Sequence, residues 1–263
     1  PLNVQQGLQG VTTCFEETRP LAMIKTLYKY LLHRRGLLAH PAAQAGVFFR
    51  TSDRVQRPDA QVHFAPAASE PDSKGNLKTT QGTTATVCHL RPESRGSVHI
   101  RSADPREYPV IRANYLDTEN DRTAIIAAVR RVRDIFAAPA LGKYLGEEFK
   151  PGAHVQSDED ILAFVRAEAE SVYHPVGTCK MGSDDAAVVD ERLRVRGIDA
   201  LRVADASVMP TIPSGNTNAP TIMIAEKCAD LVLQDAGTKV NLPEGLSSKP
   251  KRHHKKATTV TAA

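Results

Sequence analysis

Residues 171–182 read SVYHPVGTCKMG, residues 201–210 read LRVADASVMP, and residues 214–221 read SGNTNAPT. Each segment contains a polar turn next to an apolar run, and the last leads into an apolar helix predicted from Thr221 to about Leu233. Polar loops beside buried segments often carry binding and catalytic residues. We therefore expect the three turns to converge on one site.

His174 is the first candidate in this group. A helical pattern precedes it and Pro175 follows it. Because a residue before proline disfavours the helical conformation, we predict that the helix ends here. A histidine held on such a turn can act as a general base near neutral pH. A packed histidine that caps the end of a helix is the alternative interpretation.

Asn216 is the second candidate. Asn216, Thr217 and Asn218 precede Ala219 and Pro220, a composition typical of a helix start. The apolar beginning of that helix predicts a buried N-terminus, whose free N–H groups and partial positive charge suit an anionic ligand group. Plain capping of the helix is the alternative.

Together these segments resemble the C-terminal signature of the glucose–methanol–choline (GMC) family of FAD-dependent alcohol oxidoreductases. Upstream, LRPESRG at residues 90–96, SADP at 102–105 and NYL at 114–116 resemble the same family, and the resemblance runs from about Gly36 to Leu233.

The resemblance implies oxidation of a primary alcohol to an aldehyde by hydride transfer to flavin N5. In that reaction His174 accepts or stabilises the hydroxyl proton and Asn216 hydrogen-bonds the same oxygen. It also implies that FAD is contacted by Asp205, Ala206, Asn216, Thr217 and Asn218.

Residues 44 and 48 bear on the substrate. Choline-using relatives have an acidic residue where Gln44 stands here, and a carboxylate pairs with a quaternary ammonium better than a glutamine does. Phe48 is close by, but the sequence has no tryptophan and only 5% aromatic residues, so an aromatic cage for a cation is not expected. We therefore expect a neutral alcohol, held by Gln44 and Phe48, with choline second.

The dinucleotide fingerprint G-x-G-x-x-G after a strand is absent from the sequence, whereas family members carry it near their N-terminus to hold the FAD diphosphate. We therefore expect the C-terminal part of such an enzyme, which lacks the N-terminal FAD-binding region and is inactive alone. The expected division is a substrate domain at 1–173, the C-terminal part of the FAD domain at 174–236, and a disordered basic tail at 237–263. A choline dehydrogenase, a hydroxynitrile lyase-like member and a non-catalytic fragment stay open as alternatives.

Composition excludes several other classes. The 263 residues are 41% apolar and 24% charged, as in ordinary globular proteins. Five basic residues at 249–256 account for the net charge of +4, so the rest is near neutral and nucleic-acid binding is not expected. No apolar run reaches the length of a membrane span, so any membrane contact would be peripheral. We expect no metal site, because the four cysteines are widely spaced and the acidic group at 184–191 lacks the spacing of a calcium-binding loop. Reduced cysteines would suit a cytoplasmic location.

Hydrophobic periodicity predicts an α+β fold: a mostly antiparallel sheet of about five or six strands, covered on one side by helices. Two of the predicted helices carry an apolar stripe at helical spacing. In the helix at 119–137 the stripe is Ile125, Val129, Val132 and Phe136, and in the helix at 158–172 it is Leu162, Val165, Ala169 and Val172. The expected helices are 20–35, 119–137 and 158–172, the last leading to His174. The expected strands are 11–15, 45–50, 60–65, 84–90, 97–101 and 110–113, with 84–90 paired to 97–101 and a long loop at 66–83.

Overall fold

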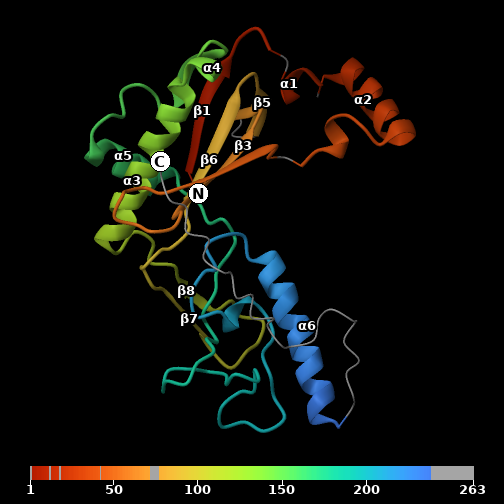
Figure 1. Ribbon diagram of the computed structural model, residues 1–263, viewed down its shortest axis with the longest axis vertical. Coiled ribbons are helices and arrows are strands. Elements are labelled where there is room, and N and C mark those ends of the chain that lie inside the picture. The colour runs from red at the N-terminus through yellow and green to blue at the C-terminus, as the bar shows by residue number, and fades with distance from the viewer. Residues whose placement is uncertain (1, 12, 18, 42, 72–76, 238–263) are drawn as a thin grey trace, which may run out of the picture.

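The computed structural model describes residues 2–11, 13–17, 19–41, 43–71 and 77–237, and its largest element is a five-stranded sheet (Figure 1). Every neighbouring pair of strands in this sheet is antiparallel, which confirms the predicted α+β class. In spatial order the strands are β2 (Ala45–Phe49), β3 (Ala60–Ala65), β6 (Thr83–His89), β1 (Leu2–Leu8) and β9 (Leu145–Lys150).

The remaining elements are two small hairpins and a set of helices. One hairpin pairs β4 (Ala68–Pro71) with β5 (Leu77–Thr80), and the other pairs β7 (Ser97–His99) with β8 (Val110–Arg112). The helices are α1 (Cys14–Glu17), α2 (Pro20–His33), α3 (Glu119–Ala137), α4 (Pro139–Gly142), α5 (Asp158–Glu168) and α6 (Asn218–Asp235), with 3-10 turns η1 (Leu37–Ala39) and η2 (Ala206–Val208).

α3 covers one face of the sheet and contacts β3 and β6 (Figure 1). Its N-cap Thr118 accepts a hydrogen bond from the N–H of Asp121, which satisfies one free donor of the first turn. The predicted stripe is confirmed, because all four of its side chains are buried against the sheet: Ile125, Val129, Val132 and Phe136.

α5 packs on α3 and begins with the predicted capping box, formed by Ser157 and Asp160. Its predicted apolar stripe was largely wrong: Ile161 and Val165 are the buried residues of the helix. The helix ends at Glu168 because Ala169 already has extended backbone, so the chain reaches His174 through an irregular segment rather than through the helix.

Three predictions for the strands were wrong. Residues 2–8 form β1, an inner strand of the sheet that was not predicted. The strand predicted at 11–15 instead overlaps α1. The loop predicted at 66–83 contains the β4–β5 hairpin. The segment 84–90 does not pair with 97–101, because β6 already has β3 on one side and β1 on the other. Instead, the Asp121 carboxylate accepts hydrogen bonds from the N–H groups of Glu93 and Ser94, which ties the following turn to the start of α3.

The expectation that helix 20–35 covers the sheet was also wrong. α2 stands apart from the sheet and contacts mainly α1 and η1 (Figure 1).

Among the described residues, no helix has both the length and the apolar character that crossing a bilayer would require.

A second apolar cluster lies in the C-terminal part of the chain, where irregular loops pack along α6 (Figure 1). Its buried residues are Val189, Leu193, Val208, Met209, Ile224 and Cys228. The predicted division of the chain after residue 173 stays a prediction, and the predicted tail lies almost wholly outside the described residues.

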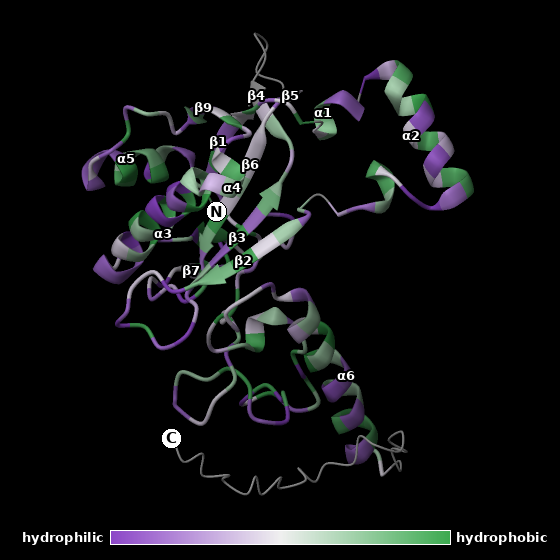
Figure 2. Ribbon diagram, turned by 45° about the horizontal axis from the view of Figure 1, so that its top comes forward, coloured by the Kyte–Doolittle hydropathy of each residue, from purple (hydrophilic) through white to green (hydrophobic). Residues whose placement is uncertain are grey.

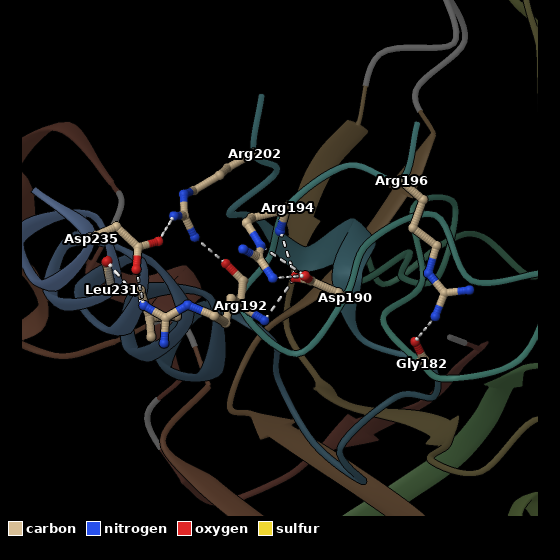
Figure 3. Close-up of polar contacts among 8 residues, drawn as sticks. All are labelled: Gly182, Asp190, Arg192, Arg194, Arg196, Arg202, Leu231 and Asp235. Atoms are coloured by element: carbon tan, nitrogen blue, oxygen red, sulfur yellow. Dashed lines mark hydrogen bonds and ion pairs between the residues drawn. The ribbon is translucent and has the colours of Figure 1, made fainter. Parts of the chain in front are cut away.

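An arginine clamp holds the C-terminal end of α6 on these loops (Figure 3). Arg192 and Arg202 both donate to the carboxylate of Asp235, and Arg192 also donates to the carbonyl of Leu231 at 3.4 Å. Positive charge at this position complements the negative end of the helix dipole. The clamp therefore fixes the far end of the helix whose first residues adjoin His174.

The clamp generates a pH-dependent prediction. The two arginines hold the pKa of the Asp235 carboxyl below its usual range. A depressed carboxyl pKa stabilises the fold above the unfolded-state pKa, and this stabilisation is lost as the pH falls through the folded-state pKa. We expect Asp235→Asn to lower the thermal unfolding midpoint at neutral pH, with the difference from the parent disappearing in acid. Asp185→Asn, on an exposed loop, should change the midpoint little, and an equal effect of both variants would contradict the clamp.

Candidate functional site

His174 makes one hydrogen bond through each of its ring nitrogens. Its Nε2 lies 2.8 Å from Nδ2 of Asn216, and its Nδ1 lies 3.0 Å from Oγ1 of Thr217. An amide nitrogen only donates, so Nε2 accepts in this arrangement and Nδ1 carries the proton. His174 is therefore held as a neutral imidazole whose Nε2 lone pair points to Asn216.

Gln61 sets the orientation of the Asn216 amide. Nε2 of Gln61 donates to Oδ1 of Asn216 at 3.2 Å, which leaves the amide nitrogen of Asn216 for His174. Gln61 is the second residue of β3 and is only 6% exposed, whereas the Asn216 side chain is exposed. The sheet thus supplies a fixed donor to a residue that comes 155 positions later in the chain.

His63 follows Gln61 on the same face of β3, since side chains two positions apart point to the same side of a strand. Burial lowers the pKa of His63, and a positive charge on His174 would lower it further. His63 is therefore a second imidazole near the site that favours its neutral form.

A small cavity of about 30 Å³ adjoins His174 and Asn216 and also contacts Gln61, Cys88 and His89. This is about the space of one water molecule. His89 is partly buried, and its buried Nδ1 has no hydrogen-bond partner among the described residues, since the carboxylate oxygen of Asp121 is 3.7 Å away. Burial lowers the pKa of His89 in spite of that carboxylate.

The start of α6 adjoins the same residues. Thr217 is the N-cap residue, but it has helical backbone and its side chain makes no capping bond. Its hydroxyl bonds His174 instead, so plain capping does not describe its role. Asn218, the first helical residue, is exposed.

The other candidate residues lie on separate elements of the structure. The Asp205 carboxylate accepts hydrogen bonds from the backbone and hydroxyl of Ser207, and so caps η2, which begins at Ala206. On β2, Phe48 is paired directly with Gln61 and is 52% exposed. Gln44 is exposed and precedes β2, with its N–H bonded to the carbonyl of Phe64.

The structure thus brings together His174, Asn216 and Thr217, and adds residues that the sequence argument missed. Of these, Gln61 and His63 had a partial signal, because polar residues alternate with apolar ones along the predicted strand at 60–65, whereas His89 ends a different strand, β6. Alternation shows that a polar face exists, but it does not show which loop covers that face.

Among the described residues, no group of three or more histidine, cysteine, aspartate or glutamate side chains is placed to hold a metal ion. Of the acidic group at 184–191, Asp184 pairs with Lys180 and Asp190 pairs with Arg194.

Comparisons with a family model and with individual proteins point to the same family. The family model described as GMC oxidoreductase matches residues 92–225. The chain is 43% identical over 208 residues to an alcohol dehydrogenase [acceptor] from Pseudomonas putida, and the aligned region covers 79% of this chain and 38% of that protein. It is 43% identical over 253 residues to the mitochondrial choline dehydrogenase of Mus musculus, which covers 93% of this chain and 42% of that protein.

Solved structures agree on the fold. A formate oxidase from Aspergillus oryzae superimposes with a TM-score of 0.79 at 22% sequence identity, covering 90% of this chain and 46% of that one. The chain therefore spans less than half the length of each of these relatives.

The hydrogen bonds of His174 predict a tautomer that can be measured in the chain itself. We expect ring-nitrogen NMR spectra to show the Nδ1–H form of His174. Thr217→Val removes the acceptor of that proton and should shift the ring toward the Nε2–H form. Thr221→Val is the matched control, because the Thr221 hydroxyl donates to the carbonyl of Thr217 and not to the ring. An Nε2–H form in the parent would contradict the assignment.

Proposed function

The chain belongs to the GMC oxidoreductase family, and on this premise we propose that it supplies the acid–base site of an enzyme that oxidises a primary alcohol to an aldehyde with FAD. The observation that carries the proposal is the pair formed by Nε2 of His174 and Nδ2 of Asn216, 2.8 Å apart. One member can accept a proton and the other can donate a hydrogen bond, and both are needed around a reacting hydroxyl group.

In the proposed reaction the alcohol oxygen binds between His174 and Asn216 and replaces their direct contact. His174 accepts the hydroxyl proton at Nε2, and Asn216 donates to the oxygen and fixes its direction. The proton on Nδ1 stays hydrogen-bonded to the Thr217 hydroxyl, so the ring orientation is kept as Nε2 becomes protonated. Gln61 prevents the Asn216 amide from rotating and presenting its oxygen to the substrate.

FAD, when bound, would supply the two-electron acceptor that takes the hydride from the alcohol carbon. The residues present fit such a group. The first N–H groups of α6 are not capped by the Thr217 side chain, and the exposed Asn216 and Asn218 lie beside them. These groups would stabilise negative charge on a ring placed there, with Asp205 and Ala206 on the neighbouring turn.

We propose further that the 263-residue chain alone holds FAD weakly and is inactive, because its sequence has no diphosphate fingerprint. Activity is therefore tested in a complete enzyme that contains this segment.

In such an enzyme, His174→Ala should slow anaerobic reduction of FAD by alcohol by roughly 10²–10⁴-fold, the usual contribution of a general base. Asn216→Ala should cost less, about 1–3 kcal/mol of transition-state stabilisation, because it removes one hydrogen bond. Both variants should keep their FAD, as judged by the visible spectrum.

The matched control is His99→Ala, since His99 is an exposed histidine on β7. Reduction at the parental rate in His174→Ala would disprove the assignment. A complete enzyme whose FAD is not reduced by any alcohol would instead favour the lyase-like or non-catalytic alternative.

We propose a neutral primary alcohol rather than choline as substrate. The relatives include an alcohol dehydrogenase at 43% identity and choline dehydrogenases at 41–47% identity, a difference too small to decide between the two substrates. The argument depends on Gln44, which offers a dipole where an ammonium group would need a carboxylate.

Gln44→Glu should therefore raise kcat/KM for choline several-fold relative to an uncharged alcohol of similar size, about 1 kcal/mol for one added ion pair. Gln234→Glu makes the same charge change at the exposed end of α6 and should leave the ratio unchanged. A clear preference of the parent for choline would contradict the proposal.

A further inference from the structure

α2 exposes its apolar side chains instead of burying them. Six large apolar residues of this helix are between 47% and 84% exposed: Leu21, Ile24, Leu27, Tyr28, Leu31 and Leu32. The helix projects away from the sheet at one corner of the molecule, as both ribbon views show (Figures 1 and 2). An exposed apolar surface of this extent marks a contact with a partner.

The six residues lie on one side of the helix. At 3.6 residues per turn they fall within a sector of about 140°. The opposite side faces the protein: Thr26 is buried and hydrogen-bonds Glu17, and Met23 and Tyr30 are partly buried. The apolar sector, here called the outer face of α2, is therefore directed away from the rest of the described chain.

The charged residues of α2 and of the segment that follows it are all basic. The sequence from residue 18 to residue 52 contains six lysines and arginines and no aspartate or glutamate. Lys25 and Lys29 border the outer face on one side, and Arg34 and Arg35 follow the helix directly. All four of these basic residues are exposed.

This charge distribution selects among the possible occupants. A second copy of the chain would bring the same positive charges against its own, which opposes association. An anionic bilayer offers acyl chains for the apolar residues and phosphates for the basic ones, and basic amphipathic helices bind such surfaces. We propose that the outer face of α2 binds the surface of an anionic lipid bilayer, with Lys25, Lys29, Arg34 and Arg35 against lipid phosphates.

The test is sedimentation of the chain with phosphatidylserine–phosphatidylcholine vesicles and with phosphatidylcholine vesicles. The basic tail at 249–256 could itself bind anionic lipid, so its five lysines and arginines are replaced by glutamine in every protein used. We expect binding to the anionic vesicles that weakens at high salt, and much weaker binding to phosphatidylcholine alone.

Two sets of substitutions separate the apolar and the basic contributions. Leu21→Ser with Ile24→Ser and Leu31→Ser should lower the partition coefficient by roughly tenfold or more, because three apolar side chains no longer enter the lipid. Lys25→Gln with Lys29→Gln should lower it several-fold on anionic vesicles only. The matched control is Ile222→Ser with Met223→Ser on α6, which are 55% and 59% exposed. Circular dichroism and the thermal midpoint verify that each variant is folded.

Four results with the isolated chain would overturn the proposal. They are no binding of the parent, unchanged binding of the Leu21, Ile24 and Leu31 variant, and equal loss in the α6 control. The fourth is a dimeric parent that the same α2 substitutions convert to a monomer without vesicles. A complete enzyme containing this segment is tested in parallel. If it fails to bind while the chain binds, the outer face is covered by the rest of that protein and the proposal is wrong.

Discussion

The hydrogen bond from Gln61 to Asn216 joins the sheet to the loops that carry the candidate catalytic residues. Its two partners are fixed by separate apolar clusters. β3 contributes Ala60 and Val62 to the cluster beneath α3, while the loop bearing Asn216 leads into α6, which contributes Ile224 and Cys228 to the second. Because each partner is anchored in its own cluster, the bond fixes the direction of the Asn216 amide, and through it the role of His174 Nε2.

The alternation of β3 makes this arrangement possible. Neighbouring side chains of a strand point to opposite faces, so Val62 enters the core while Gln61 and His63 point away from it. The same division extends across the sheet: Leu2 and Val4 of β1 are buried in the core, whereas Asn3 and Gln5 bond Thr86 and Thr84 of β6. A shift of one residue in the register of β3 would bury Gln61 against α3 without a partner, at a cost of about 1–3 kcal/mol.

Local patterns predicted what depends on neighbours in sequence. The stripe of α3 and the capping box of Ser157 and Asp160 are examples, since both repeat within one or two turns of helix. The motif resemblance pointed to His174, Asn216 and Thr217. Strand partners could not be predicted in this way, because whether residues 84–90 pair with 97–101 depends on β1, which joins the sheet from the other end of the sequence. Gln61 was missed for the same reason, as nothing near it in sequence indicates a contact with Asn216.

Backbone strain on both sides of the site shows what its geometry costs. Tyr173, directly before His174, has φ of 58°, and Ser214, two residues before Asn216, has φ of 60°. A non-glycine residue in this left-handed region costs roughly 1–3 kcal/mol unless the surrounding structure enforces it. Thr217 departs from the usual pattern as well, because an N-cap residue normally has extended backbone and uses its side chain on the helix. All three departures lie within two residues of the groups that hold the His174 ring between the Thr217 hydroxyl and the Asn216 amide, an arrangement that local backbone preferences alone do not predict.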